Sequence, residues 1–299
     1  VFSLQTVNRI APRDAEGRPQ LHQTFTDAQL KAVSEAVLQQ CDALDGLRDG
    51  MVNDFQACKF DPRNQVCGSG TVPAGQCLTA RQADGLRTIF GGARNSRGES
   101  LYGSYAYDTG IAAPAWRSMH LGTPTGAPAN ASLGRDTLRE FAITPADPTL
   151  DPLQFDFDRD MVRLEETAAM NDPVARLLST FAGRGSKMIV YHGLSDQAMS
   201  VGALTGWYNQ LLPRTAAGPQ EWARLFLIPG MLHCAGGQAT DQFDMLTVIQ
   251  DWVENKRAPD QVIASGRAFP DTTRPLCPYP KVARYDGGDA KNASSFSCR

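Results

Sequence analysis

The segments Lys187-Met-Ile-Val-Tyr-His-Gly-Leu-Ser-Asp196 and Leu225-Phe-Leu-Ile-Pro-Gly-Met-Leu-His233-Cys234 decide the fold of this chain. Each is a short apolar run that ends abruptly in glycine and a polar residue. Such a run is typical of a buried parallel strand that delivers a functional side chain to its C-terminal end. The 37 residues from Asp196 to His233 leave room for one strand–helix–strand unit, so we expect both side chains at one edge of a parallel sheet.

An acid followed by a histidine is the order in which α/β-hydrolases place the last two members of a Ser…Asp…His triad. Asp196 would accept a hydrogen bond from one imidazole nitrogen of His233 and fix its tautomer. Each residue also has an ordinary interpretation, Asp196 as a helix cap and His233 as a half-buried histidine. His192, four residues before Asp196, is interpreted as structural or as a neighbour that supports the catalytic pair. No Gly-x-Ser-x-Gly elbow lies upstream, so the sequence predicts two triad members without the nucleophile.

Composition excludes several classes of protein. The chain has 299 residues, of which 42% are hydrophobic, enough for a full buried core. The net charge is −3 without a basic stripe, which argues against a nucleic acid partner. No run approaches the ~18 apolar residues that a membrane helix needs. The first residue is Val1 and no signal peptide precedes it, so we expect a processed or truncated product.

Seven cysteines stand at positions 41, 58, 67, 77, 234, 277 and 298, and none forms a Cys-x-x-Cys pair. Their layout favours sequence-local disulfides in an exported protein, secreted or periplasmic. The alternative is a set of buried free thiols in a cytosolic enzyme. Because the number is odd and Cys234 stands alone, we expect it to pair outside this chain or to remain a thiol.

The chain divides into two predicted domains. Residues 1–170 contain helices at 26–40 and 79–90, marked by Thr26–Gln29 and Thr79–Gln82 capping boxes, and an irregular stretch at 93–150. Residues 171–299 alternate as the end of a doubly wound sheet, with helices at 172–182, 202–212 and 240–254 and strands at 187–192 and 223–228. A stable sheet needs more than two strands, and residues 1–170 offer no further strand–helix–strand series.

The segment from Asp42 to Met51 crowds three carboxylates, those of Asp42, Asp45 and Asp49, into one loop with two glycines. Like charges at this spacing repel unless a cation relieves them, and Ca²⁺ accepts carboxylates together with backbone carbonyls. The spacing is not that of an EF-hand. An ordinary turn rich in Asp and Gly is the alternative.

Several motifs together resemble the tannase and feruloyl esterase family. They are Tyr191-His-Gly-Leu-Ser-Asp196, Pro229-Gly-Met-Leu-His233-Cys234, Phe243-Asp-Met-Leu, Arg274-Pro-Leu-Cys277-Pro-Tyr-Pro280 and Cys41-Asp42-x-x-Asp45-Gly-x-x-Asp49-Gly. The resemblance implies an α/β-hydrolase core, of which this chain is the C-terminal portion, with a large disulfide-rich, calcium-binding lid inserted after the nucleophile. Residues 1–170 would be the lid and residues 171–299 the last part of the core.

The same resemblance assigns roles to residues. Asp196 would be the triad acid, His233 the base and Cys234 half of a disulfide to a cysteine beside the serine, in a Cys-Ser-x-Gly-Gly elbow that this sequence lacks. An N-terminal segment or partner chain would therefore carry the nucleophile. The implied local disulfides are Cys41–Cys58, Cys67–Cys77 and Cys277–Cys298. Structural Ca²⁺ would be bound by the side chains of Asp42, Asp45 and Asp49 and by the carbonyls of Leu47 and Met51.

The expected function is serine-dependent hydrolysis of esters of aromatic acids such as gallate, ferulate or a phthalate-like group. Trp116 is the candidate substrate-binding ring, with Tyr102, Tyr105 and Tyr107 beside it in the sequence, although local packing is the ordinary role of aromatic residues in loops. The alternative function is that of a non-catalytic, calcium-stabilised binding module.

Overall fold

The computed structural model describes residues 1–68, 72–172, 178–211 and 219–299, which fall into two compact units. Unit 1 comprises Val1–Val33, Asp61–Tyr105 and Ala112–Pro173, and unit 2 comprises Ser34–Phe60, Ala106–Ile111 and Val174–Arg299. The sequence suggests a single boundary near residue 170. In the structure, residues 34–60 and 106–111 pack with the C-terminal part instead, so the acidic loop lies in unit 2.

Unit 1 is helical. Its helices are α1 (Phe2–Ile10), α3 (Ala80–Gly91), α4 (Pro114–His120), α5 (Ala129–Asp136) and α6 (Glu165–Asn171). The helix predicted at 79–90 is α3, and both hydrogen bonds of its capping box are present. The stretch at 93–150, predicted as irregular, contains α4 and α5. These two helices have only 7 and 8 residues, too few to show a helical period.

Helix α2 (Asp27–Cys41) runs from unit 1 into unit 2 and corresponds to the prediction at 26–40. Its N-terminus carries the expected capping box, in which Thr26 and Gln29 exchange side-chain-to-backbone hydrogen bonds of 3.0 and 3.1 Å. The helix ends at the first cysteine of the acidic segment, so it leads directly into that loop.

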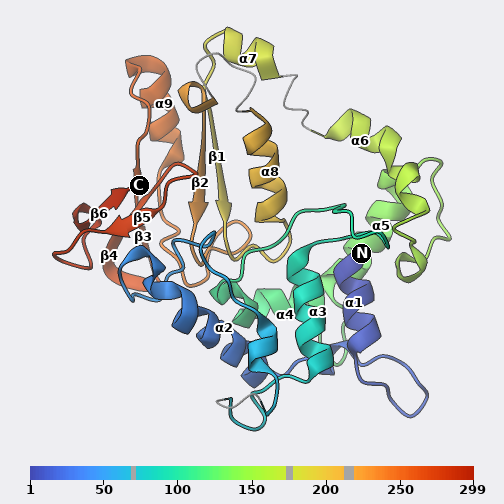
Figure 1. Cartoon of the computed structure of the whole chain (residues 1–299). Coiled ribbons are helices and arrows are strands. Elements are labelled where there is room, and N and C mark those ends of the chain that lie inside the picture. Colours follow the sequence, from blue (N-terminus) through green and yellow to red (C-terminus); the bar gives the residue numbers. More distant parts are fainter. Residues whose placement is uncertain (69–71, 173–177, 212–218) are drawn as a thin grey trace. The chain divides into compact units, whose positions relative to one another are not determined.

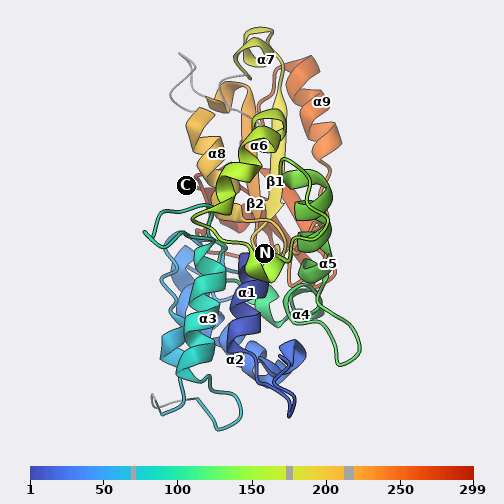
Figure 2. The ribbon, with the colours of Figure 1, turned by 90° about the vertical axis from the view of Figure 1, so that its right-hand side faces the viewer.

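The centre of unit 2 is a parallel pair of strands, β1 (Met188–Gly193) and β2 (Ala223–Ile228). The register runs from Met188 opposite Ala223 to Gly193 opposite Ile228. Helix α8 (Val201–Leu211) lies between the strands in the sequence, and α9 (Met245–Asn255) follows β2. Figures 1 and 2 show α8 and α9 on opposite sides of this pair of strands.

Side chains of β2 alternate between two apolar clusters. Ala223 and Leu225 pack with Tyr208 and Leu211 of α8, whereas Phe226 and Ile228 pack with residues after β2 and with Val248 of α9. A parallel strand covered by helices on both faces is apolar throughout, which is why this segment reads as a continuous hydrophobic run.

The rest of unit 2 contains α7 (Ser179–Gly183) and two antiparallel strand pairs that the sequence did not indicate: β3 (Val262–Gly266) with β4 (Phe269–Leu276), and β5 (Ala283–Tyr285) with β6 (Phe296–Cys298). Residues 274–280 are rich in proline and contain a cysteine, so their apolar and polar residues do not alternate as in a typical strand. Bonding of Cys277 to Cys298 joins β6 to the end of β4.

Two helices differ in extent from their predicted ranges. The helix predicted at 240–254 begins only at Met245, because Asp244 caps it by accepting the Thr247 N–H at 3.0 Å. The helix predicted at 172–182 falls partly on residues 173–177, which lie outside the described residues, and α7 covers its far end.

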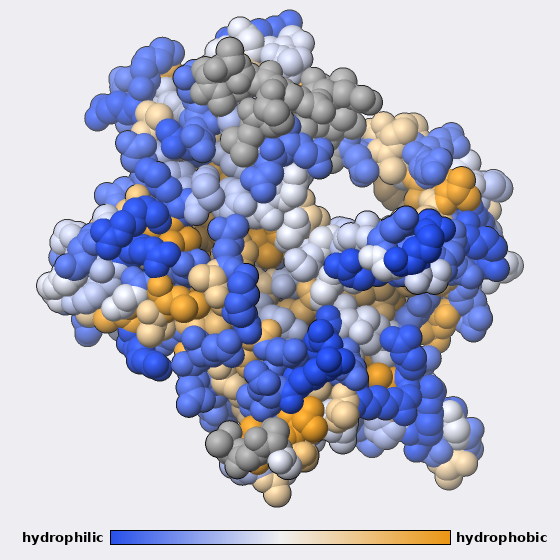
Figure 3. All heavy atoms as spheres, viewed as in Figure 1, coloured by the Kyte–Doolittle hydropathy of each residue, from blue (hydrophilic) through white to orange (hydrophobic). Residues whose placement is uncertain are grey.

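Hydrophilic residues cover most of the face seen in Figure 3, with apolar residues in small groups. No helix among the described residues is long and apolar enough to cross a bilayer.

Truncating the core of β2 should destabilise the fold. Leu225 is 0% exposed, so Leu225→Ala should lower the free energy of unfolding by about 2–5 kcal/mol through lost burial and a residual cavity. Leu246→Ala is the matched control, because Leu246 is 77% exposed and its loss should change stability by less than about 0.5 kcal/mol. Urea unfolding of both variants measures the difference, and equal losses would contradict the placement of β2.

Candidate functional site

The loops that follow β1 and β2 lie against each other. The Ser195 N–H donates to the Met231 carbonyl oxygen at 3.1 Å, and the Leu194 N–H donates to the Ile228 carbonyl oxygen at 2.9 Å. Gly193 allows this approach, since a Cβ there would collide with the Met231 backbone, and Gly230 allows a close approach to the Gln238 backbone within the loop after β2. The two strand ends therefore present their loops side by side.

Asp196 and His233 meet at this edge. The Nδ1 atom of His233 lies 2.9 Å from Oδ2 of Asp196. The Asp196 side chain is 4% exposed, whereas that of His233 is 42% exposed. Since a carboxylate can only accept, Nδ1 carries the proton of this bond and Nε2 is left to exchange a proton with another group.

Backbone groups fix the carboxylate in turn. Oδ1 of Asp196 accepts the N–H groups of Ala198 and Met199 at 2.7 and 2.9 Å. One oxygen is thus occupied by its own loop and the other is directed at His233. Asp196 does not cap the following helix, because Ala198 and Met199 precede α8 and the Ser200 hydroxyl accepts the Ala203 N–H there.

His192 does not take the place of His233. Its Nδ1 atom lies 3.9 Å from Oδ2 of Asp196, beyond hydrogen-bonding distance, and its Nε2 lies 3.2 Å from the carbonyl oxygen of Met199. Burial lowers the pKa of His192, and the charge of Asp196 opposes this only in part. A neutral His192 that donates to a carbonyl oxygen has a structural role, as the sequence suggests.

Asp108 is a site residue that the sequence did not indicate. It is 2% exposed, and its Oδ2 accepts the N–H of Gly230 at 2.7 Å. It also accepts a hydrogen bond from the Ser195 side chain, whose Oγ in turn accepts the N–H of Gly110 at 2.9 Å. Its partners lie up to 122 residues away in the sequence, so no local motif marks it.

Three disulfides are present in the described residues: Cys41–Cys58, Cys67–Cys77 and Cys277–Cys298, the pairs that the resemblance implies. Cys234 is a free, exposed thiol directly after His233. Ser195 cannot serve as a ready nucleophile in this arrangement, because it is 6% exposed and bonded to Asp108 and Gly110.

The acidic loop of unit 2 is buried and strained electrostatically. Burial raises the pKa of Asp45 to about 6, and the charges of Asp49 and Asp42 add to the rise. Burial also raises the pKa of Asp49, although its ion pair with Arg274 at 2.6 Å opposes this rise. These shifts show carboxylates whose charge is only partly compensated, which is the chemistry a hard cation suits.

In the arrangement seen, however, the carboxylates of this loop hold backbone and side-chain donors. Asp42 accepts the N–H groups of Asp49 and Gly50, and Asp45 accepts Nδ2 of Asn53 at 2.7 Å. Within the described part of the chain, no group of three or more His, Cys, Asp and Glu side chains is placed to ligate one metal ion. Calcium therefore stays a prediction for this loop.

Trp116, the candidate substrate-binding ring, is 3% exposed. Its ring packs within unit 1 against Phe25, with centroids 6.3 Å apart, and against His120, with centroids 4.7 Å apart. Tyr107 likewise packs on Phe60 in unit 2 at 5.2 Å. Local packing, the alternative role of these aromatic residues, describes both rings in this structure.

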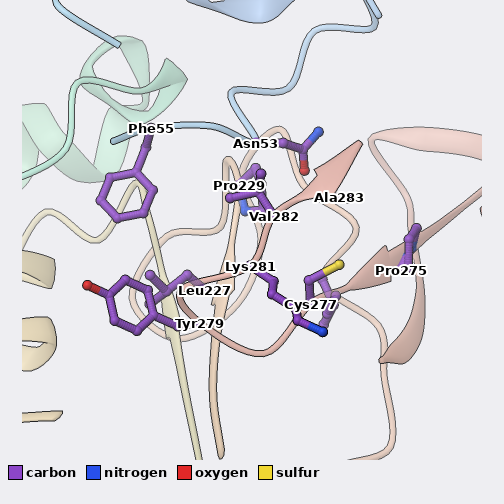
Figure 4. A pocket seen from close by; sticks show the side chains of 11 residues that line it. Asn53, Phe55, Leu227, Pro229, Pro275, Cys277, Tyr279, Lys281, Val282 and Ala283 are labelled. Carbon is purple, nitrogen blue, oxygen red and sulfur yellow. The ribbon is translucent and has the colours of Figure 1, made fainter. Parts of the chain in front are cut away.

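A small cavity lies behind the end of β2. Figure 4 shows Leu227 and Pro229 facing Phe55 and Tyr279 around it. Its volume of about 20 Å³ has room for about one water molecule. It is therefore a packing defect beside the His233 loop rather than a site for a substrate.

Comparison with known proteins places the chain among esterases. The family model "Tannase and feruloyl esterase" matches residues 2–299. A mono(2-hydroxyethyl) terephthalate hydrolase of Piscinibacter sakaiensis is 37% identical over 341 residues, which cover 98% of this chain and 56% of that protein. An uncharacterised esterase of Xanthomonas campestris pv. campestris is 32% identical, over 92% of this chain and 55% of its own length.

Among solved structures, feruloyl esterase B of Aspergillus oryzae superimposes with a TM-score of 0.75 at 25% sequence identity. The match covers 100% of this chain and 60% of that one. The chain thus spans about half the length of the curated relatives it matches. The strand–helix–strand core is consistent with the α/β-hydrolase-like fold of these neighbours.

Removing the Asp45 charge should change the pH dependence of stability. The raised pKa of about 6 means that the ionised form is disfavoured in the folded state, so wild-type stability is lost as pH rises through 6. In the presence of a chelator, the free energy of unfolding of Asp45→Asn relative to that of the wild type should rise by about 1.5 kcal/mol between pH 5 and pH 8. Added calcium should stabilise the wild type more than the variant.

Urea unfolding at each pH measures these free energies, and Asp54→Asn is the matched control. Asp54 is also buried, at 8% exposure, but it is neutralised by Arg284 at 2.5 Å, so its loss should destabilise the protein at pH 8. If the free energies of unfolding of wild type and Asp45→Asn changed in parallel with pH, the raised pKa of Asp45 would be contradicted.

Proposed function

The chain belongs to the tannase and feruloyl esterase family, and from this premise we propose that it provides the acid and the base of a serine carboxylic-ester hydrolase. The observation that carries the proposal is the 2.9 Å hydrogen bond between Asp196 and His233 at the C-terminal ends of two parallel strands. A buried acid that orients a half-exposed imidazole is the arrangement general base catalysis requires.

The proposed reaction proceeds in two halves. Nε2 of His233 removes the proton of a serine hydroxyl as its oxygen attacks the ester carbonyl carbon, and Asp196 stabilises the imidazolium that forms. The imidazolium then gives its proton to the leaving alkoxide as the bond between the carbonyl carbon and the alcohol oxygen breaks. This step leaves an acyl-serine. In the second half, water replaces the serine hydroxyl, and the acid is released.

We place the serine on a segment or partner chain outside this sequence. Two observations support this placement: the chain covers 56% of the terephthalate-ester hydrolase it resembles, and Ser195 is engaged by Asp108 and Gly110. In the described residues, β1 also pairs only with β2. Among these residues its other edge pairs with no strand, and such an edge can take further strands.

Cys234 is the proposed link to that segment. It is exposed, adjoins the base and has no partner among the described cysteines. A disulfide from Cys234 to a cysteine beside the serine would hold nucleophile and base together, which restricts them to reactive geometries.

The proposed substrates are esters of aromatic acids, of the terephthalate or ferulate kind. The names of the relatives support this class, since one hydrolyses mono(2-hydroxyethyl) terephthalate and a structural neighbour is a feruloyl esterase. We further propose that the acidic loop binds structural calcium through Asp42, Asp45 and Asp49 with the carbonyls of Leu47 and Met51. We also propose that the protein is exported, a location in which its three disulfides are stable.

Substitutions in the pair should abolish ester hydrolysis in a preparation that includes the serine-bearing part. His233→Gln should lower kcat by about 10³-fold or more and Asp196→Asn by about 10²–10⁴-fold, because the base is lost or its tautomer is no longer fixed. His22→Gln, at the surface of unit 1, is the control and should retain activity. Hydrolysis of a p-nitrophenyl ester of an aromatic acid measures the rates; an active His233→Gln enzyme would refute the proposal.

If the serine lies on a partner chain, reductant should separate the protein into two chains. Intact mass spectrometry under non-reducing conditions should give a mass above the 32.4 kDa of this chain, and reduction should release it. Cys234→Ser should prevent the linkage. A single 32.4 kDa species whose Cys234 thiol reacts with iodoacetamide before reduction would count against a partner held through this residue.

A further inference from the structure

We propose that Asp108 is a positioning residue that holds the Asp196 loop and the His233 loop in their relative places. Its catalytic meaning rests on the proposed function, but the positioning itself does not. The residue lies in the short segment Ala106–Ile111, which belongs to unit 2 although its chain enters and leaves through unit 1.

The first contact is with the loop that carries the base. Oδ2 of Asp108 accepts the N–H of Gly230 at 2.7 Å, three residues before His233. Gly230 has a φ of +72°, and a Cβ there would collide with the Gln238 backbone, so the residue lies in a closely packed left-handed turn. The bond therefore fixes the start of the His233 loop rather than a flexible side chain.

The second contact is with the loop that carries the acid. Ser195, directly before Asp196, donates its hydroxyl hydrogen to Asp108 and accepts the Gly110 N–H at 2.9 Å. Gly110 is itself required here, because a Cβ at this position would collide with the Ser195 side chain. One buried carboxylate thus binds both catalytic loops.

The charge at this position is specific. The carboxylate accepts hydrogen bonds on both oxygens: Oδ1 from the N–H of Thr109 at 2.7 Å and Oδ2 from the N–H of Gly230, with the Ser195 hydroxyl as a further donor. Burial raises the pKa of Asp108, and these hydrogen bonds favour its charged form against that effect. An amide would direct its NH₂ at a backbone N–H, so Asn cannot replace Asp without losing a bond.

Besides the Asp196–His233 bond itself, the backbone bonds from Ser195 to Met231 and from Leu194 to Ile228 also join these segments, and both lie before the two catalytic residues. Both loops extend beyond the strand ladder, which ends at Gly193 and Ile228. A shift of about 1 Å in a catalytic group costs on the order of 10²-fold in rate. Loss of the bridge should therefore affect the orientation of His233 before it affects the core.

The test is Asp108→Asn, read by NMR on the protein as isolated, together with any chain that it holds. A proton on a ring nitrogen that is hydrogen-bonded to a carboxylate resonates at low field. The wild type should therefore show a signal for the His233 Nδ1–H, and its loss in His233→Gln assigns it. In Asp108→Asn this signal should broaden or disappear. Asp54→Asn is the matched control: a buried aspartate of the same unit that touches neither loop, whose loss should leave the signal unchanged.

A second variant covers a failure of Asp108→Asn to fold. Ser195→Ala removes the hydroxyl that joins Asp108 to the acid loop and leaves a smaller perturbation. It should weaken the same signal, while Ser200→Ala, a buried hydroxyl that caps the following helix through the Ala203 N–H, should not. A sharp, unshifted signal in folded Asp108→Asn, or in Ser195→Ala when Asp108→Asn does not fold, would overturn the proposal.

Kinetics separate this inference from the proposed function. In a preparation that hydrolyses esters, Asp108→Asn should lower kcat by about 10- to 100-fold with KM within about twofold, because binding groups are untouched. A lost kcat with an intact NMR signal would overturn the positioning role. A lost signal in a protein that hydrolyses no ester at all would uphold the positioning role and reject the proposed function instead.

Discussion

The parallel pairing of β1 and β2 is the constraint on which the site depends. Because Gly193 lies opposite Ile228, both strands end at the same edge, and the residues that follow them emerge together. Gly193 lets the backbone after β2 approach the end of β1 within hydrogen-bonding distance. Asp196 and His233 are thus neighbours in space because the strands are in this register, and a shift of the register would separate them.

Unit 2 solves the problem of buried carboxylates in three ways. Asp196 is directed at a histidine and at two backbone N–H groups, and Asp108 accepts two backbone N–H groups and the Ser195 hydroxyl. Asp49 and Asp54 are paired with arginines from the C-terminal strands. Asp45 accepts neutral donors, the Leu47 N–H and the Asn53 amide, and burial together with the charges of Asp49 and Asp42 raises its pKa to about 6. The candidate calcium loop thus differs from the candidate catalytic pair in holding several carboxylates that repel one another.

Those arginines also explain why residues 34–60 belong to the C-terminal unit. Arg274 reaches Asp49, and Arg284 reaches Asp54 and the Leu44 carbonyl oxygen. The guanidinium of Arg274 also lies over the Phe296 ring at 4.5 Å. With the Cys41–Cys58 and Cys277–Cys298 disulfides, these contacts hold together segments with little apolar surface of their own.

Elements whose cause is local can be predicted from the residues alone. Capping boxes mark α2 and α3, apolar runs mark β1 and β2, and the order of Asp196 and His233 indicates the pair that the structure joins at 2.9 Å. Only the tertiary structure decided the antiparallel strands β3–β6, the burial of Trp116 and the place of Asp108. Asp108 binds Gly230 from 122 residues away, and such a contact depends on how the chain returns to the strand ends. A period or a cap acts within a few residues, whereas that return is determined by packing across the whole unit.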